Sequence, residues 1–195
     1  MNLTTLERLL ELDNTFPNGK EDNLLNMIIK GVSYKVAQYM GRKIQIGEYT
    51  EIFHYTKKTN CKFQLQAAPL TGPLVEVKDL IQDVVLDLDE IKPFSLYSDR
   101  GWIQDLFAYD FTLQGDSFSV TYTGGMATDT ADFIAKYPEI EYEVLLQCLF
   151  EYKRKKTISV SKIGNSGTNA EEYYAPVFRK ELIRAIRPYR LAFFG

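Results

Sequence analysis

One stretch, residues 138–156, constrains the fold of this chain more than any other. It reads PEIEYEVLLQCLFEYKRKK and opens with a proline, which suits the first turn of a helix because an N–H has no partner there. Acidic residues follow the proline and four basic residues close the stretch, which matches the two ends of a helix dipole. Between them lies an apolar band made of Val144, Leu145, Leu146, Cys148, Leu149 and Phe150. The band is too broad for one neighbour to cover. We therefore predict a central core helix, with Leu145 and Leu149 buried.

Four further segments have helical signals. Thr4 or Thr5 can cap a short helix that carries three leucines, and apolar residues recur at three- and four-residue spacings over residues 21–40, up to Gly41. The inward positions expected in the second helix are Leu25, Ile29, Val32, Val36 and Met40. A short helix is predicted over residues 130–137. A last helix is predicted from about Ala175, with Pro176 in its first turn and Pro188 at its end.

The middle of the chain has the spacing of β-strands. Alternation is cleanest around Phe118, Val120 and Tyr122, and the same period is found over residues 47–57 and 62–67. Shorter strands are predicted at 74–78, with Val75 and Val77 together, and at 84–88, 94–97 and 102–107. Pro69, Gly72 and Pro73 indicate a turn.

These patterns predict an α+β fold in a single domain, residues 1–195. A small bundle of about four to five helices is expected from residues 1–46 and 128–195, with an antiparallel β module inserted at about 47–123. Residues 157–174 are rich in Gly, Asn, Ser and Thr, which predicts a mobile loop. The start of the chain lacks the basic and apolar blocks of a signal peptide, and no apolar run reaches about 18 residues, so a cytosolic protein is expected.

No residue pattern predicts catalysis, a metal site or a cofactor. His54 is the single histidine and has no nucleophile or carboxylate motif beside it. The acidic cluster at Asp83, Asp87, Asp89 and Glu90 lacks the spacing and the glycine of a calcium loop, which favours a solvated strand face. Gly124-Gly125 has no phosphate-loop continuation.

The cysteines and a cluster of aromatic residues are better explained by packing than by a functional site. Cys61 and Cys148 are too few for a metal motif, and Cys148 is expected to be a small buried apolar residue. A cluster of aromatic residues fits sheet core better than a platform for stacking bases. These residues are Tyr97, Trp102, Phe107 and Tyr109.

Charge is divided unevenly along the chain. Residues 1–150 carry 13 Lys and Arg against 22 Asp and Glu, whereas residues 151–195 carry 10 against 4, within a net charge of −3. A basic end of this kind either contacts an acidic partner or nucleic acid, or is simply solvated.

Taken in order, several segments resemble the head-to-tail connector, or adaptor, proteins of long-tailed double-stranded DNA bacteriophages. LTTLERLLELD and EDNLLNMIIKGVSYKVAQYMGRKI are similar to the family's opening helix pair, and YTEIFHY, LVEVKDL and SFSVTYTGGM resemble its strands. PEIEYEVLLQCLFEYKRKK resembles its long helix, and APVFRKELIRAIRPYR resembles a closing helix that ends in Pro-Tyr-Arg. The chain departs from the family in a longer middle, residues 79–116.

This resemblance implies a structural virion protein of a phage or prophage and no enzyme. It implies a ring, usually of twelve subunits, between the portal protein and a stopper or tail-completion protein in the virion neck. DNA would pass through the ring without sequence specificity. The residues expected to face the channel or the portal are Lys153, Arg154, Lys155, Lys156, Lys162, Arg179, Lys180, Arg184 and Arg187. Two alternatives stay open: another neck or tail-completion protein, and a nucleic-acid-binding module that uses the basic C-terminal third.

Overall fold

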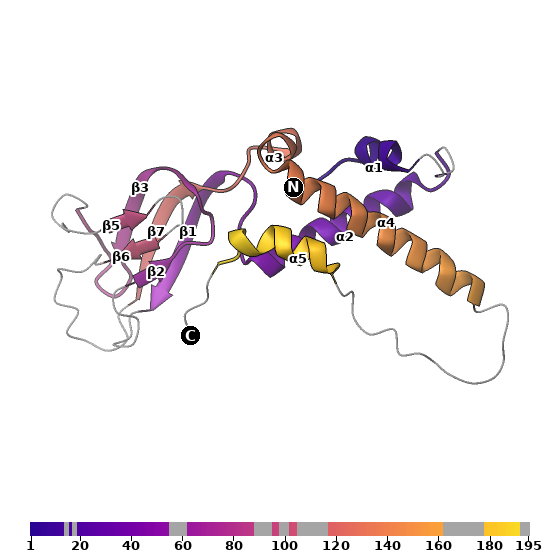
Figure 1. Cartoon of the computed structure of the whole chain (residues 1–195). Coiled ribbons are helices and arrows are strands. Elements are labelled where there is room, and N and C mark those ends of the chain that lie inside the picture. Colours follow the sequence, from indigo (N-terminus) through magenta and orange to yellow (C-terminus); the bar gives the residue numbers. More distant parts are fainter. Residues whose placement is uncertain are drawn as a thin grey trace. The chain divides into compact units, whose positions relative to one another are not determined.

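The chain divides into two compact units, one of helices and one of strands. The computed structural model describes residues 1–13, 16, 19–54, 62–87, 95–97, 102–104, 117–161 and 178–191. The helical unit contains Met1–Met40 and Thr130–Arg190, and the strand unit contains Gly41–Asp129 together with Leu191 (Figure 1). The expected α+β fold, a small helical bundle with an antiparallel β module, is confirmed.

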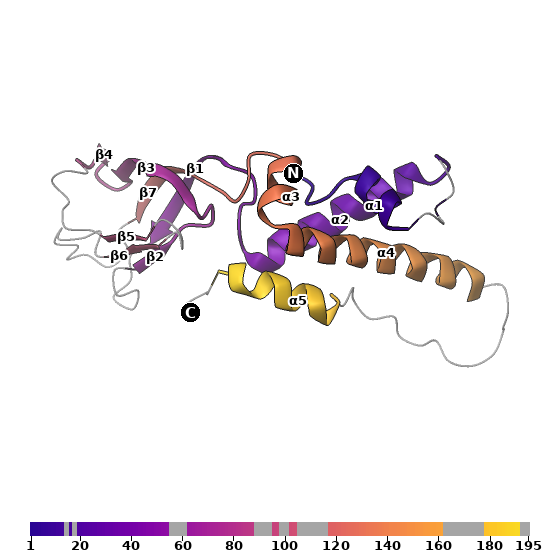
Figure 2. The same cartoon turned by 45° about the horizontal axis from the view of Figure 1, so that its top comes forward.

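Five α-helices are described in the helical unit. They are α1 (Leu6–Leu12), α2 (Asp22–Met40), α3 (Thr130–Lys136), α4 (Pro138–Ser161) and α5 (Lys180–Ile186), and a 3-10 turn, η1 (Arg187–Tyr189), follows the last. α4 is the centre of the unit, since α1, α2, α3 and α5 all contact it (Figure 2). No helix among the described residues is long and apolar enough to cross a membrane.

Local signals set the boundaries of the first two helices. Thr5 is the N-cap of α1, and its hydroxyl accepts a hydrogen bond from the Arg8 N–H at 3.3 Å. Gly41 follows α2 with φ of 67°, a left-handed conformation that glycine adopts without strain. All five inward positions expected in α2 are buried, which confirms its core face.

α4 differs from its prediction in length and in the face that it buries. It continues to Ser161, so residues 157–161 are helix, and the loop prediction is wrong there; residues 162–174 lie outside the described part. No glycine or proline interrupts the chain before Gly164, which allows the extra turn. Leu145 is 3% exposed as predicted, whereas Leu149 is only half-buried.

α5 begins later than predicted. Phe178 and Arg179 are not helical and the helix starts at Lys180, so Pro176 is not in its first turn; residue 176 itself lies outside the described part. Leu182 and Ile186 are fully buried, as their fourfold spacing predicts. Pro188 lies in η1, where the α-helix has ended.

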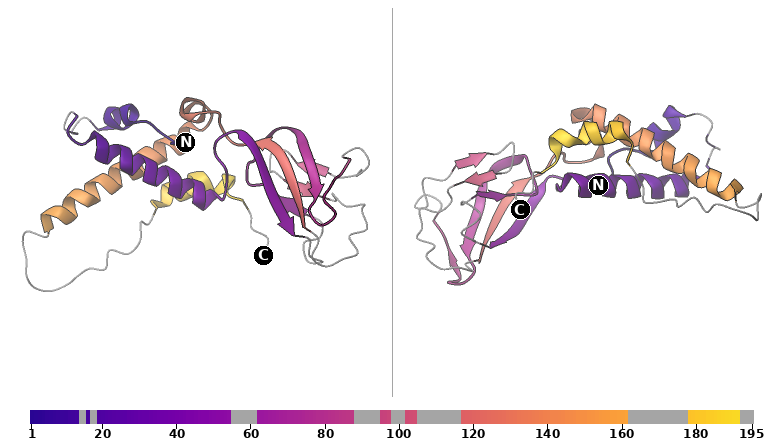
Figure 3. Two further views of the ribbon diagram at one scale, coloured as in Figure 1. Left: turned by 180° about the vertical axis from the view of Figure 1, so that it is seen from behind. Right: turned by 60° about the horizontal axis from the view of Figure 1, so that its bottom comes forward.

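Two antiparallel sheets make up the strand unit. The larger has the order β1 (Gly47–His54), β7 (Ser117–Gly124), β3 (Leu70–Asp79) and β4 (Val84–Val85), and β1, β7 and β3 lie side by side in Figure 3. The smaller has the order β2 (Lys62–Gln64), β6 (Trp102–Gln104) and β5 (Ser95–Tyr97). Phe63 of β2 packs among Phe118, Val120 and Tyr122 of β7, so apolar side chains of both sheets share one core.

β3 corrects two predictions. The expected turn at residues 69–73 is mostly strand, because β3 already begins at Leu70 and includes Gly72 and Pro73. Its pairing with β7 shifts between Leu70 and Leu74 and again before Glu76, which matches the tolerance of proline and glycine at bulges. The second shift separates Val77, which is buried, from Val75, which is 55% exposed, so these valines do not share a face.

Candidate functional site

The basic residues at the end of α4 are partly used within the helical unit. The Lys153 ammonium lies 3.3 Å from a carboxylate oxygen of Asp13, and the Arg154 guanidinium lies 2.9 Å from one of Glu151. Lys155 is exposed. Lys156 belongs to α4, but its side chain lies outside the described part, and so does all of Lys162. The cluster predicted here is therefore not a uniform row of available charges.

Arg179 also has acidic partners. Its guanidinium lies 3.4 Å from Glu143 on α4 and 3.7 Å from Glu181 on α5. The side chain is only 29% exposed, so we assign Arg179 to holding α5 against α4.

Three of the predicted basic residues do form one exposed surface. Lys180, Arg184 and Arg187 follow one another at spacings of four and three, which places them on one face of α5 and η1. All three are exposed, and among the described residues none forms an ion pair with them. We call these three residues the basic stripe. Such a stripe can bind phosphate groups or an acidic protein surface.

Contacts at both ends of α5 and η1 fix the direction of the basic stripe. At the start, the Arg179 N–H donates a hydrogen bond of 2.9 Å to the side-chain oxygen of Gln147, which is buried on α4. At the end, the Tyr189 hydroxyl donates to Glu139 at 3.3 Å, and burial together with this carboxylate raises the Tyr189 pKa. The Arg190 guanidinium lies 4.9 Å from the centre of the Tyr39 ring. Sequence reasoning missed Gln147, because a buried glutamine has no local signature.

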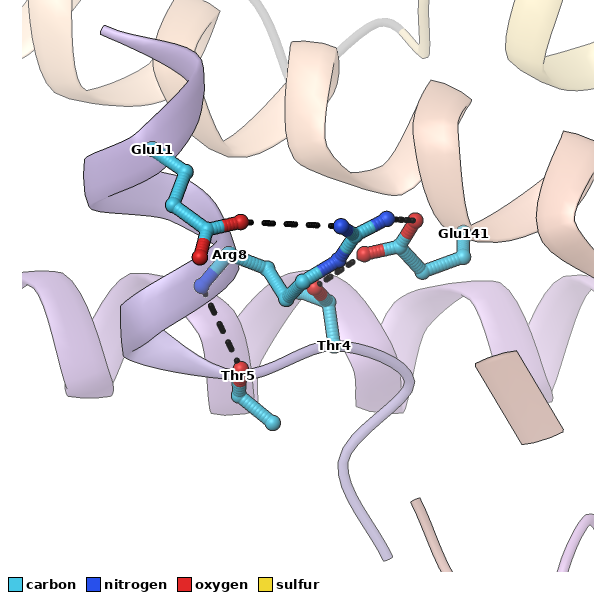
Figure 4. Close-up of polar contacts among 5 residues, drawn as sticks. All are labelled: Thr4, Thr5, Arg8, Glu11 and Glu141. Carbon is cyan, nitrogen blue, oxygen red and sulfur yellow. Dashed lines mark hydrogen bonds and ion pairs between the residues drawn. The ribbon is translucent and has the colours of Figure 1, made fainter. Parts of the chain in front are cut away.

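The N-terminal segment is held to α4 by a buried carboxylate (Figure 4). Glu141 is 1% exposed and accepts hydrogen bonds from the Thr4 hydroxyl at 2.7 Å and from the Arg8 guanidinium at 3.4 Å. The hydrogen bond to Glu141 and the negative charge of that carboxylate raise the pKa of Arg8. The charge of Glu141 is therefore paired inside the unit, as a buried carboxylate requires.

A second polar pair, part-buried, lies in the strand unit. The Tyr122 hydroxyl accepts from the Ala67 N–H at 2.9 Å and donates to the carboxylate of Glu51. Burial raises the pKa of Glu51, and burial with this hydrogen bond raises that of Tyr122. Both groups join β1, β7 and the segment after β2, so we regard the pair as structural.

His54 and the described residues of the acidic cluster either form local polar contacts or are exposed. A ring nitrogen of His54 lies 2.7 Å from the hydroxyl of Ser117 directly across β1 and β7, on an exposed face, and no described carboxylate contacts His54. Asp83 forms an ion pair of 2.5 Å with Lys78, which lowers the pKa of Asp83. Asp87 is exposed, and Asp89 and Glu90 lie outside the described part. No three potential metal ligands gather within the described ranges.

The glycine pair and Cys148 fit packing. A side chain at Gly124 would collide with the Ala67 carbonyl and one at Gly125 with the Gln45 carbonyl, so backbone approach explains both glycines. Cys148 is buried, which raises its pKa to about 12, as expected for an inert thiol. Tyr97 and Trp102 are opposite each other in β5 and β6. Cys61, Phe107 and Tyr109 lie outside the described part.

Comparisons with known proteins find a shared fold with chains of low sequence identity. No protein-family model matches the chain, and no curated protein is similar to it in sequence. A chain from the neck of an empty GTA particle computed with C6 symmetry has a TM-score of 0.58 at 11% identity, covering 99% of this chain and 92% of that one. A chain from the virion of a native gene transfer agent (GTA) particle has a TM-score of 0.58 at 13% identity, covering 100% and 96%.

A third similar chain comes from the neck of the native GTA particle computed with C12 symmetry. Its TM-score is 0.51 at 9% identity, with 100% of this chain and 96% of that one covered. At these identities the likeness establishes the fold alone, but the fold is matched over essentially the whole length of both chains.

Proposed function

We propose that this chain is a structural subunit of a virion neck, the adaptor between head and tail of a tailed phage or a gene transfer agent. The observation that carries the proposal is the full-length fold match to chains of GTA necks. In this role the chain is not an enzyme. It assembles as a ring of twelve subunits below the portal protein, and a stopper or tail-completion protein binds on the other side.

The basic stripe supports a contact with DNA or with an acidic portal surface. Its three cations are exposed on a helix whose direction is fixed by Gln147 and Tyr189. Backbone phosphates are recognised by such cations without regard to sequence, which suits DNA that passes through a channel. A contact with DNA or the portal is less strongly supported for Lys153, Arg154 and Arg179, because each has an acidic partner in its own subunit.

Electron microscopy of the chain mixed with the portal protein of its own particle tests the adaptor role. We expect closed rings on one end of the portal assembly. A complex with a tail protein and none with the portal would favour another neck or tail-completion role instead.

Binding to a mixed-sequence DNA duplex tests the role of the basic stripe. The double variant Lys180→Gln with Arg184→Gln should weaken binding. The slope of the logarithm of the binding constant against the logarithm of the salt concentration should fall by about one for each of the two cations that contacts a phosphate. The matched control, Lys20→Gln with Lys43→Gln, removes the same charge from exposed positions elsewhere. Equal weakening in both double variants would mean that net charge alone drives binding. Tight DNA binding by the monomer, without assembly on a portal, would favour the nucleic-acid-binding module.

A further inference from the structure

Two helices of the helical unit expose apolar side chains that the unit does not cover. On α4, Tyr142 and Phe150 are 51% and 47% exposed, although the opposite side of the same helix forms the core. On α2, Met27 and Tyr34 are 69% and 63% exposed. Apolar groups that recur on one exposed helix face indicate a protein contact.

The two faces have the same geometry. Tyr142, Leu146 and Leu149 follow one another at spacings of four and three, and Leu146 and Leu149 are half-buried; we call these three residues the α4 seam. Met27, Gly31 and Tyr34 have the same spacings on α2, and we call them the α2 seam. Spacings of four and three are those of helices that pack side by side with knobs in holes. The two seams therefore match in length and in period.

Gly31 makes the α2 seam hollow at its centre. A glycine inside a helix costs stability relative to other residues, and no atom lies within 4 Å of the place where a Cβ would be at Gly31. Nothing in the described helical unit therefore requires a glycine at this position. A missing side chain between Met27 and Tyr34 leaves a hole that a large side chain of another helix can fill.

Charges around the two seams are complementary. Lys30 and Lys35 lie on the exposed side of α2, and neither forms an ion pair with a residue in the described ranges. At the start of α4, Glu139 is exposed three residues before Tyr142, and Lys153, four residues after Leu149, is already paired with Asp13. Opposite net charge at two surfaces favours their docking and disfavours contact of either surface with itself.

We propose that the α4 seam of one copy of this chain packs into the α2 seam of the next copy. The proposal rests on the ring assembly proposed above and names the surface that closes it. Because the seams lie on two different helices of one unit, the contact is heterologous. It leaves one seam open at each end of any chain of copies, and it can repeat until a ring closes.

Sedimentation velocity of two seam variants and their mixture tests this contact. Gly31→Glu fills the hole, and Tyr142→Glu places a charge on the other seam. Gly31→Glu removes a helix-interior glycine and adds a favourable spacing of four to Lys35, so in dilute solution its melting temperature should rise, by about 2–4 °C. Assembly and subunit stability are thereby expected to change in opposite directions. Asn26→Glu, on an exposed part of α2 beside the seam, is the matched control.

We expect the wild-type chain and the Asn26→Glu control to associate as concentration rises, and each seam variant to stay monomeric. An equimolar mixture of the two seam variants retains one intact pair of seams, so it should form dimers and nothing larger. Rings formed by either variant alone would contradict the proposed contact between the seams, but they would not contradict the ring assembly itself. A wild-type end state that is a two-fold dimer would overturn both.

Two other outcomes would also overturn the seam proposal. A wild-type chain that stays monomeric up to its solubility limit would exclude self-contact through these surfaces. Seam variants that lose binding to the portal while the mixture forms no dimer would assign the seams to that partner.

Discussion

Leu145 and Leu149 lie four residues apart on α4 in different surroundings. Leu145 faces the core, whereas Leu149 belongs to the α4 seam and is half-buried. We expect Leu145→Ala to lower the free energy of unfolding by about 2–5 kcal/mol. Leu149→Ala should cost about 1 kcal/mol, because water already reaches that side chain. Urea unfolding of the monomers measures both, and equal losses would contradict the assignment of two environments.

Glu51 is expected to make the stability of the strand unit depend on pH. Burial raises its pKa above the ordinary 4.5, so the folded state keeps the proton longer than the unfolded state does. The stability that this proton contributes is complete below pH 4.5 and is lost as pH rises through the folded pKa. In Glu51→Gln the side chain is always neutral and can still accept from Tyr122, so the variant should lose less stability over this range.

Unfolding free energies measured from acid pH to neutrality check this expectation. The difference between Glu51→Gln and the wild type should grow in favour of the variant above pH 4.5 and then level off. Glu48→Gln, at an exposed position of the same strand, is the control and should follow the wild type. Parallel curves for Glu51→Gln and the wild type would show that the carboxyl has no raised pKa.

At the scale of elements, α5 depends on α4 for its position. With seven residues α5 is too short to persist by itself, so its contacts with α4 must hold it. Gln147→Ala removes the acceptor of the Arg179 N–H and should cost about 1–3 kcal/mol. Amides of residues 180–186 should then exchange faster with solvent. Gln38→Ala, at an exposed site on α2, should change neither quantity. Unchanged exchange in the Gln147 variant would mean that packing of Leu182 and Ile186 suffices.

At the scale of the whole molecule, the helical unit is built from the two ends of the described chain. Residues 1–40 and 130–190 form one compact unit, and the strands come from the sequence between them. We propose that replacing residues 41–129 by a flexible Gly/Ser linker leaves a helical protein that melts cooperatively, since residues 1–40 and 130–190 form a compact unit of their own. Circular dichroism during heating measures this.

A chain truncated after residue 129 is the contrasting variant. It keeps Gly41–Asp129 of the strand unit but loses Leu191 together with α3, α4 and α5, so α1 and α2 should unfold. If the linker variant also melts without cooperativity, the two units do not fold separately.

Sequence alone was sufficient where the determining forces are local. Thr5, Gly41 and Pro138 act on neighbouring backbone groups, so the limits of α1, α2 and α4 near them could be predicted. The alternation at Phe118, Val120 and Tyr122 predicted a buried strand, because the period of side chains along a strand depends on its backbone alone. The α+β class followed from the order of such segments.

Only the tertiary structure decided which of several similar residues takes which role. The spacing of the apolar residues on α4 predicts the same burial for Leu145 and Leu149. Their burial differs because other helices cover one side of α4. Arg179 and Arg184 are likewise equivalent in sequence, yet Glu143 of α4 pairs with the first and leaves the second exposed. Burial and ion pairing are set by groups distant in sequence, and a local pattern contains no information on which distant group will lie within reach.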